Sequence, residues 1–134
     1  MAANEAHVGI KSDTDIVTAR SQGRMLATGL GFSSGDTTLI ATAISELGRN
    51  ILSYAGQGEI SISAVDGCGR CGILIIASDK GPGIPDVQQA LRDGFSTSGG
   101  LGLGLPGVRR LMDEFEITSV PKRGTTVKAK KWKL

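Results

Sequence analysis

The residues of this chain with the clearest chemical potential begin with a carboxylate and a carboxamide on one predicted helix. Glu46 and Asn50 lie four residues apart within residues 36–54, so both project from the same helical face. An amide oxygen such as that of Asn50 is a hard ligand that suits Mg²⁺, and the carboxylate of Glu46 can accept a proton from an attacking hydroxyl group. The alternative interpretation is a solvated helix flank, on which Arg49 lies beside the pair.

A second candidate site lies directly after an apolar segment. Asp79 is followed by Gly81 and Gly83 in the stretch Asp-Lys-Gly-Pro-Gly. A carboxylate at a strand end can accept a hydrogen bond from the amino group of a nucleotide base, and the glycines would leave room for the flat ring. The alternative is an ordinary type II turn.

A third candidate is a glycine-rich stretch that precedes a predicted helix. The backbone amides of Gly100, Gly102 and Gly104, together with the helix N-terminus, would form an anion site without a basic side chain. No Gly-Lys-Ser/Thr follows, which excludes a Walker loop, and the stretch follows a loop rather than a strand, unlike a Rossmann fingerprint. A flexible hinge is the alternative.

A short motif, Gly124-Thr125-Thr126, opens the last predicted strand. The hydroxyl groups of Thr125 and Thr126 could support the floor of a pocket near Asp79. The alternative is an ordinary strand start.

Among the elements that must position these residues, the helix over residues 36–54 has the clearest apolar periodicity. Its apolar residues recur at i, i+3, i+4, i+7 and i+11, which makes one stripe. Asp36 is the predicted N-cap, and Gly56 the predicted stop. Residues 59–65 and 72–78 predict a hairpin, and the continuous apolar run in the second strand predicts burial on both faces.

The remaining elements complete an α+β pattern. They are a strand at 7–10, a helix at 14–30, a short helix at 86–91, a loop at 92–104, a helix beginning near Pro106, and strands at 115–119 and 125–131. A loop of this length in a compact domain is usually functional, often a lid. The order predicts a two-layer sandwich, with helices on one face of a mixed or antiparallel sheet.

Composition narrows the class of protein. The chain has 134 residues, 40% hydrophobic and 21% charged, with a formal net charge of +2. These values predict one globular domain over residues 1–134 and give no support for a nucleic-acid partner. No apolar run is long enough to span a membrane, and the N-terminus lacks the pattern of a signal peptide, so we expect a cytoplasmic protein.

Two further groups of residues are interpreted as structural. Cys68 and Cys71 form a single C-x-x-C in a predicted turn, without the second ligand pair that zinc needs, and we expect a reduced pair. Lys128, Lys130, Lys131 and Lys133 give the C-terminal strand a basic character, which is typical of a charged edge strand that resists aggregation. The alternative is contact with an acidic partner surface.

Taken together, the four motifs resemble the four sequence boxes of the GHKL superfamily (gyrase, Hsp90, histidine kinase, MutL), in the same order and over nearly the whole chain. The resemblance implies a Bergerat-type ATP site. In such a site, Asp79 binds the adenine amino group, Gly81 and Gly83 shape the base pocket, and Thr125 and Thr126 line its base end. Asn50 holds Mg²⁺ against phosphates that Gly100, Gly102 and Gly104 cradle, and Glu46 accepts the proton of the substrate hydroxyl. Arg49 is a further candidate to face the phosphates.

Within that superfamily, two stretches are similar to the small serine kinases that regulate sigma factors, and specifically to the stressosome switch kinases. These stretches are residues 43–51 and 93–115. The similarity implies an ATP-dependent serine/threonine protein kinase that phosphorylates STAS-domain antagonist proteins and, once released, activates a PP2C-type phosphatase. The alternative is an anti-sigma factor kinase that sequesters a sigma factor, and a third possibility is a binding module without catalysis.

Overall fold

The computed structural model describes residues 5–84, 86–91 and 104–133. Their elements follow the predicted order of strands and helices. The bounds are β1 (Glu5–Ile10), α1 (Asp13–Gly29), α2 (Ser34–Tyr54), β2 (Gly58–Gly67), β3 (Arg70–Ser78), α3 (Val87–Ala90), α4 (Gly104–Leu111), β4 (Glu114–Val120) and β5 (Gly124–Trp132).

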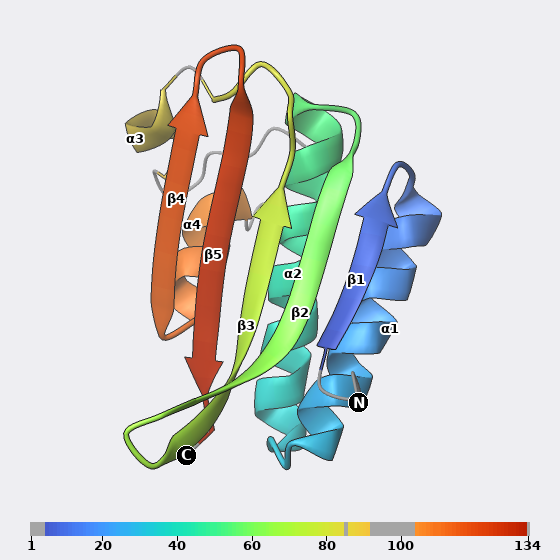
Figure 1. The fold of residues 1–134 in the computed structure, drawn as a ribbon, viewed down its shortest axis with the longest axis vertical. Helices are drawn as coiled ribbons and strands as arrows, with labels where there is room; N and C mark the ends of the chain where they lie inside the picture. Colours follow the sequence, from blue (N-terminus) through green and yellow to red (C-terminus); the bar gives the residue numbers. More distant parts are fainter. Residues whose placement is uncertain (1–4, 85, 92–103, 134) are drawn as a thin grey trace.

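The five strands form one sheet in the order β1-β2-β3-β5-β4. Every pairing is antiparallel, so the predicted α+β sandwich is confirmed in its antiparallel form. Helices α1, α2 and α4 lie behind the sheet as drawn in Figure 1, and none of the described residues forms a helix over the opposite face. The hydrophobic core lies between the two layers and is built largely from isoleucines of α2, β2 and β3.

The first turn of α2 differs from the sequence prediction. The N-cap is Ser33, whose Oγ accepts a hydrogen bond from the backbone N–H of Asp36 at 3.1 Å. Asp36 therefore lies in the first turn, where its negative charge favours the positive end of the helix dipole. The predicted stop is confirmed, because Gly56 follows the helix with φ +79°.

Strand β3 is not buried on both faces, as its apolar run had predicted. Ile73, Ile75 and Ala77 face the helices and are buried, whereas Leu74 and Ile76 are half-buried on the face that carries no helix. The run marks a central strand of an antiparallel sheet that is covered on one side only. A continuous apolar segment does not distinguish this case from a strand with two covered faces.

The prediction of a basic edge strand is also wrong. Strand β5 lies between β3 and β4, and the Lys131 side chain turns toward the helices, where its Nζ donates to the backbone oxygen of Leu111 at 2.9 Å. Lys128 is exposed on the other face. Because successive side chains of a strand point to opposite faces of the sheet, neighbouring lysines of β5 have different surroundings.

The β2–β3 hairpin is tighter than the predicted turn. Its strands pair as far as Gly67 and Arg70, which leaves Cys68 and Gly69 as the two turn residues, both with positive φ. This left-handed pair is typical of a type I′ turn. Both cysteines are free, as predicted, and Cys68 is exposed. No helix among the described residues is long and apolar enough to cross a membrane.

Candidate functional site

The Glu46 carboxylate is the most unusual group on α2. Its side chain is 2% exposed, which excludes the solvated helix flank for this residue. Oε2 accepts a hydrogen bond from Nη2 of Arg49 at 2.5 Å, and Oε1 accepts one from the backbone N–H of Gly104 at 3.0 Å. Both oxygens of a buried anion are therefore paired, as burial of a charge requires.

Arg49 pairs its guanidinium with the carboxylate of Glu46 one turn away. Its predicted position facing the phosphates remains a prediction. Asn50 is half-buried and lies one turn along α2 from Glu46. From Glu46 to the last helical residue, Tyr54, α2 rises about 12 Å. The helix therefore places Glu46 and the end of α2 at two ends of an extended site, with Asn50 between them.

The other end of that site is built around Asp79, which directly follows β3. Its Oδ1 accepts hydrogen bonds from the backbone N–H groups of Gly81, at 2.9 Å, and Thr125, at 3.3 Å. Two backbone donors on one oxygen fix the orientation of the carboxylate and leave Oδ2 to face a ligand. Asp79 is only half-buried, so a planar base with an amino group can reach it.

The two glycines after Asp79 are required by close packing. A Cβ at Gly81 would lie 2.5 Å from the Cβ of Ala55, at the end of α2. Gly83 has φ +84°, and a Cβ there would lie 2.8 Å from the backbone oxygen of Val120. Any larger residue at either position would push the turn away from its neighbours. The glycines therefore hold the segment after β3 close to α2 and to the β4–β5 turn.

Hydroxyl groups at the end of β4 and the start of β5 support this segment. Oγ of Ser119 lies 3.0 Å from Oγ1 of Thr125 and accepts a 2.7 Å hydrogen bond from the backbone N–H of Ile84. Thr125 is buried, and Thr126 is half-buried on the other face of the strand. Only the second of the two threonines lines the cavity described next. Ser119 was not predicted, because no sequence pattern links it to Ile84, 35 positions away.

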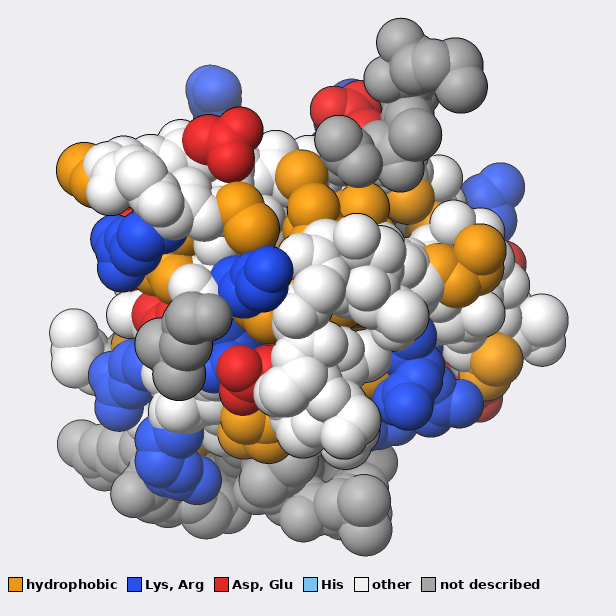
Figure 2. Space-filling view, turned by 90° about the horizontal axis from the view of Figure 1, so that it is seen from below, with side chains coloured by type: hydrophobic (Ala, Val, Ile, Leu, Met, Phe, Trp, Pro, Cys, Tyr) orange, Lys and Arg blue, Asp and Glu red, His pale blue; other side chains and the backbone are white. Residues whose placement is uncertain are grey.

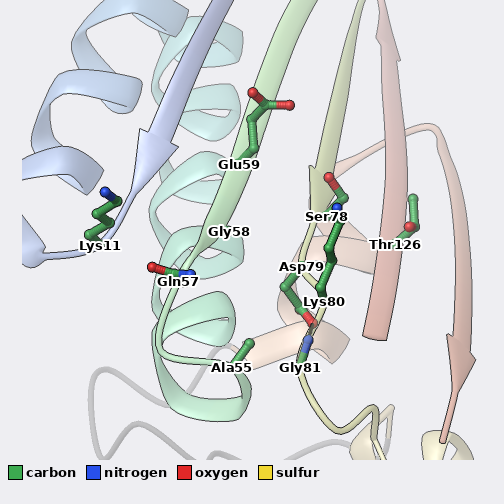
Figure 3. Close-up of a pocket in the computed structure, with 10 residues that line it drawn as sticks. All are labelled: Lys11, Ala55, Gln57, Gly58, Glu59, Ser78, Asp79, Lys80, Gly81 and Thr126. Atoms are coloured by element: carbon green, nitrogen blue, oxygen red, sulfur yellow. Dashed lines mark hydrogen bonds between the residues drawn. The ribbon is translucent and has the colours of Figure 1, made fainter. Parts of the chain in front are cut away.

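A cavity of about 650 Å³ opens beside Asp79. Figure 3 shows Asp79 and Gly81 at the end of β3, with Ala55 of α2 opposite them. The lining includes three predicted residues: Asp79, Gly81 and Thr126. It also includes residues that the sequence did not indicate, namely Lys11, Gln57, Glu59, Ser78 and Lys80. These belong to loops and strand ends, whose meeting depends on the fold rather than on spacing.

Glu46 lines a separate hollow of about 450 Å³ between α1 and α2. Gly104 begins α4 with φ +53° and is the only one of the three predicted phosphate-cradling glycines within the described part of the chain. Gly100 and Gly102, like most of the predicted loop 92–104, lie outside the described residues. No cluster of three or more His, Cys, Asp or Glu side chains that could hold a metal ion occurs in the described ranges.

At the end of the molecule opposite Asp79, the basic side chains are dispersed over the surface. Figure 2 shows this end, where Lys and Arg side chains form separate groups among hydrophobic and uncharged ones. They do not form one continuous basic surface in this view. A basic stripe or face is the usual footprint of a nucleic-acid partner, so this end of the molecule gives no reason to revise the expectation of protein partners.

Comparison with known proteins defines the class. Residues 35–134 match the family model described as histidine kinase-, DNA gyrase B-, and HSP90-like ATPase. This range contains α2 except for its first residue, the segment around Asp79 and all of α4. The chain belongs to this family, and the predicted GHKL fold with ATP as its ligand is confirmed.

Relatives define the activity more narrowly. The chain is 55% identical to the serine/threonine-protein kinase RsbT of Bacillus subtilis (strain 168), over 96% of this chain and 97% of the relative. It is 34% identical to the anti-sigma F factor of Caldanaerobacter subterraneus, over 69% of this chain and 68% of the relative. The predicted serine/threonine kinase is confirmed, and the anti-sigma alternative has weaker support.

Solved structures agree with this fold. The crystal structure of the RsbU and RsbW domains of a Mycobacterium tuberculosis protein matches with a TM-score of 0.63 at 22% identity, over 95% of this chain and 32% of that one. A mycobacterial sensor histidine kinase, MprB, matches with a TM-score of 0.56 at 14% identity, over 96% and 98% of the two chains. At these identities the likeness concerns the fold alone.

Proposed function

We propose that this protein transfers the γ-phosphate of ATP to serine or threonine in STAS-domain antagonist proteins of a stressosome. After this transfer, the released kinase binds and activates a PP2C-type phosphatase in general stress sigma-factor signalling. The observation that carries the proposal is the buried carboxylate of Glu46, held by Arg49 and Gly104. A module that only binds partners has no need of such a group, and burying it has a cost.

The nucleotide would lie along α2. The base would lie in the cavity beside Asp79, where Oδ2 would accept a hydrogen bond from its amino group and Gly81 keeps the segment after β3 close to Ala55. Thr125, which donates its backbone N–H to Asp79, and Thr126, which lines the cavity, would form the base end. The phosphates would extend toward Asn50 and the start of α4.

Asn50 is the residue that would hold Mg²⁺. Its carboxamide oxygen is a ligand type that this ion accepts, and Mg²⁺ usually keeps water and phosphate oxygens as its other ligands. The lack of a cluster of acidic side chains in the described residues fits this mode. When bound, the ion would neutralise charge on the phosphates. Gly100 and Gly102 would supply backbone amides to the same phosphates, whereas the amide of Gly104, at the start of α4, is bound to Glu46.

Glu46 would accept the proton of the acceptor hydroxyl group. Its two oxygens are oriented by the guanidinium of Arg49 and the amide of Gly104, and each retains a lone pair for a further contact. Most of the rate in phosphoryl transfer comes from positioning and from charge stabilisation, so a fixed carboxylate is suited to this role. Transfer adds about two negative charges to the acceptor, which can separate the two proteins.

A phosphotransfer assay tests the proposal. Purified protein is incubated with Mg²⁺, γ-labelled ATP and STAS-domain proteins from the same organism, alongside the Asn50→Asp variant. Label on a serine or threonine of the STAS protein, absent with the variant, is expected. Bound ATP without any transfer would contradict the kinase proposal.

The anti-sigma alternative is separated by capture of partners. Immobilised protein is presented with a STAS-domain protein and with a sigma factor in parallel. Retention of the sigma factor alone would favour sequestration, the activity that the names of the more distant relatives suggest.

A further inference from the structure

The hollow that reaches Glu46 lies outside the cavity beside Asp79. Its volume is about 450 Å³, and its lining includes Arg20 and Arg24 from α1, Thr42 from α2, and the pair Glu46 and Arg49. We refer to it as the arginine groove. The nucleotide proposed above would lie on the other side of Glu46, toward Asn50 and Asp79. The arginine groove is therefore an approach to Glu46 that does not overlap the proposed nucleotide path.

The walls of the groove are held in place by glycines in the two helices. A Cβ at Gly48 of α2 would lie 2.8 Å from Cγ1 of Ile16 in α1, and Gly23 of α1 also packs closely on Ile44 of α2. The two helices are thus in direct contact below the groove. Its shape follows from the backbones of two rigid elements rather than from loops.

The groove carries an excess of positive charge. Its one carboxylate, Glu46, is already paired with Arg49. In the part of the chain that the structure describes, Arg20 and Arg24 take part in no ion pair. The Thr42 hydroxyl donates to the backbone oxygen of Thr38 in its own helix, so the α2 wall adds no unpaired charge. Two unpaired guanidinium groups remain to attract an anion.

The third arginine of the groove, Arg49, has a hydrogen-bond donor without a partner in the described structure. Nη2 of Arg49 is bound to Glu46, but its Nε is buried and has no hydrogen-bond partner among the described residues. Buried polar groups normally have a partner. A carbonyl or carboxylate oxygen of a bound segment would supply one after a small rotation of the side chain.

The spacing of the arginines specifies the ligand further. Arg20 and Arg24 lie four residues apart on α1, and so about 6 Å apart along its axis. On an extended chain, side chains two positions apart share one face and are separated by about 7 Å. Carboxylates at alternate positions of an extended segment therefore match the two guanidinium groups, which favour such planar anions.

The geometry points to the arginine groove as the docking site for an acidic, extended segment of the substrate protein, which delivers its serine or threonine hydroxyl to Glu46. This inference rests on the proposed kinase function and adds the chemical class of the acceptor segment. Acidic residues at two alternate positions beside the acceptor residue are its signature.

Peptide binding tests the inference without depending on catalysis. The probe is a fluorescein-labelled, extended nonapeptide with one serine and aspartates at two alternate positions, and a second peptide has asparagines there. Fluorescence anisotropy measures the dissociation constant for the wild-type protein, for Arg20→Gln and Arg24→Gln, and for Lys128→Gln. Lys128→Gln removes the same charge from the exposed sheet face, away from the groove.

We expect the aspartate peptide to bind more tightly than the asparagine peptide. Each arginine variant should weaken its binding about threefold to tenfold, the effect of one charge-assisted contact, and Lys128→Gln should not. Arg24→Glu should in addition bind a peptide with lysines at the two positions better than the wild type does. Equal binding of the aspartate and asparagine peptides by the wild type would overturn the inference, as would an equal effect of Lys128→Gln.

The two proposals fail in different ways. Selective binding of the aspartate peptide, with no phosphotransfer to any protein, would support the groove and contradict the kinase function. Phosphotransfer to a STAS-domain protein at an unchanged KM in Arg20→Gln and Arg24→Gln would support the kinase function and overturn the role of the groove.

Discussion

The backbone N–H of Gly104 donates a 3.0 Å hydrogen bond to Oε1 of Glu46, across 58 residues of sequence. This bond joins the first residue of α4 to the middle of α2. The glycine-rich stretch that precedes α4 was predicted to contact phosphates, so the same junction connects the proposed base with the proposed phosphate site. Glu46 and Gly104 thus belong to one structural unit, although they come from different motifs.

Replacement of Glu46 by glutamine tests its role as the base. The amide oxygen of the introduced glutamine can still accept the hydrogen bond from Gly104, whereas its NH2 group cannot accept the one from Arg49. We expect the fold and ATP binding to be retained at a lower stability. The kcat for phosphotransfer should fall about 100-fold or more, because a carboxamide cannot accept the proton. Rates are measured with labelled ATP, and nucleotide affinity by calorimetry. Glu116→Gln, on exposed β4, is the control, and an unchanged kcat in Glu46→Gln would refute the assignment.

Asp79→Asn should weaken nucleotide binding without unfolding the protein. An asparagine oxygen can still accept from the backbone N–H groups of Gly81 and Thr125. The contact with the base amino group changes from a charged to a neutral acceptor, which should raise the dissociation constant for ATP about tenfold or more. Calorimetric titration gives this constant directly. Asp66→Asn, exposed in the hairpin, should leave it unchanged, and a similar affinity in both variants would contradict the proposed base pocket.

Gly83→Ala should destabilise the fold even without nucleotide. The residue has φ +84°, and a Cβ would lie 2.8 Å from the backbone oxygen of Val120. We expect a loss of about 1–3 kcal/mol in the free energy of unfolding, measured with urea. Gly9→Ala is the matched control, because no atom lies within 4 Å of its Cβ position. Equal stability of the two variants would show that the segment relaxes freely.

Lys131→Met should lower the stability of the fold, whereas the same substitution at the exposed Lys128 should not. The Nζ of Lys131 donates to the backbone oxygen of Leu111, the last residue of α4, and lies 3.9 Å from Oδ1 of Asp113. Its loss leaves a helix-terminal carbonyl without that donor and should lower the free energy of unfolding by about 1–2 kcal/mol. Lys128→Met should change it by no more than about 0.5 kcal/mol. If both variants lose the same amount, Lys131 does not stabilise the end of α4.

Glu114 should titrate at lower pH than an ordinary glutamate. The indole N–H of Trp132 donates to its Oε2 at 2.7 Å, and this bond, with the nearby Lys130, holds the pKa of the carboxyl below its usual value. Because the folded pKa is the lower one, the stabilisation is present above the unfolded pKa. It is lost as pH falls through the folded pKa. NMR titration of the carboxyl carbon should give a higher pKa in Trp132→Phe, and no rise would exclude Trp132 as the cause.

The order of the elements and the candidate site residues could be predicted from the sequence alone. The period of α2 is set by its own apolar residues, and the glycines after Asp79 mark a place where backbone must pass close to other atoms. These signals are local, so they can be read without the fold. They identified Glu46, Asn50 and Asp79 as candidates, and two of the three have the buried or backbone-fixed setting that such roles need.

Which side chains contact one another depended on the packing of the whole fold. The partner of Arg49, the inward direction of Lys131 and the role of Ser119 depend on contacts that a sequence period does not specify. Strand order likewise placed β5 inside the sheet and left one face of β3 without helices. These contacts and the strand order depend on how the helices and the sheet pack around the core. The spacing of apolar residues within one element does not specify that packing. The arginine groove is of this kind, because it exists only where α1 and α2 pack against each other.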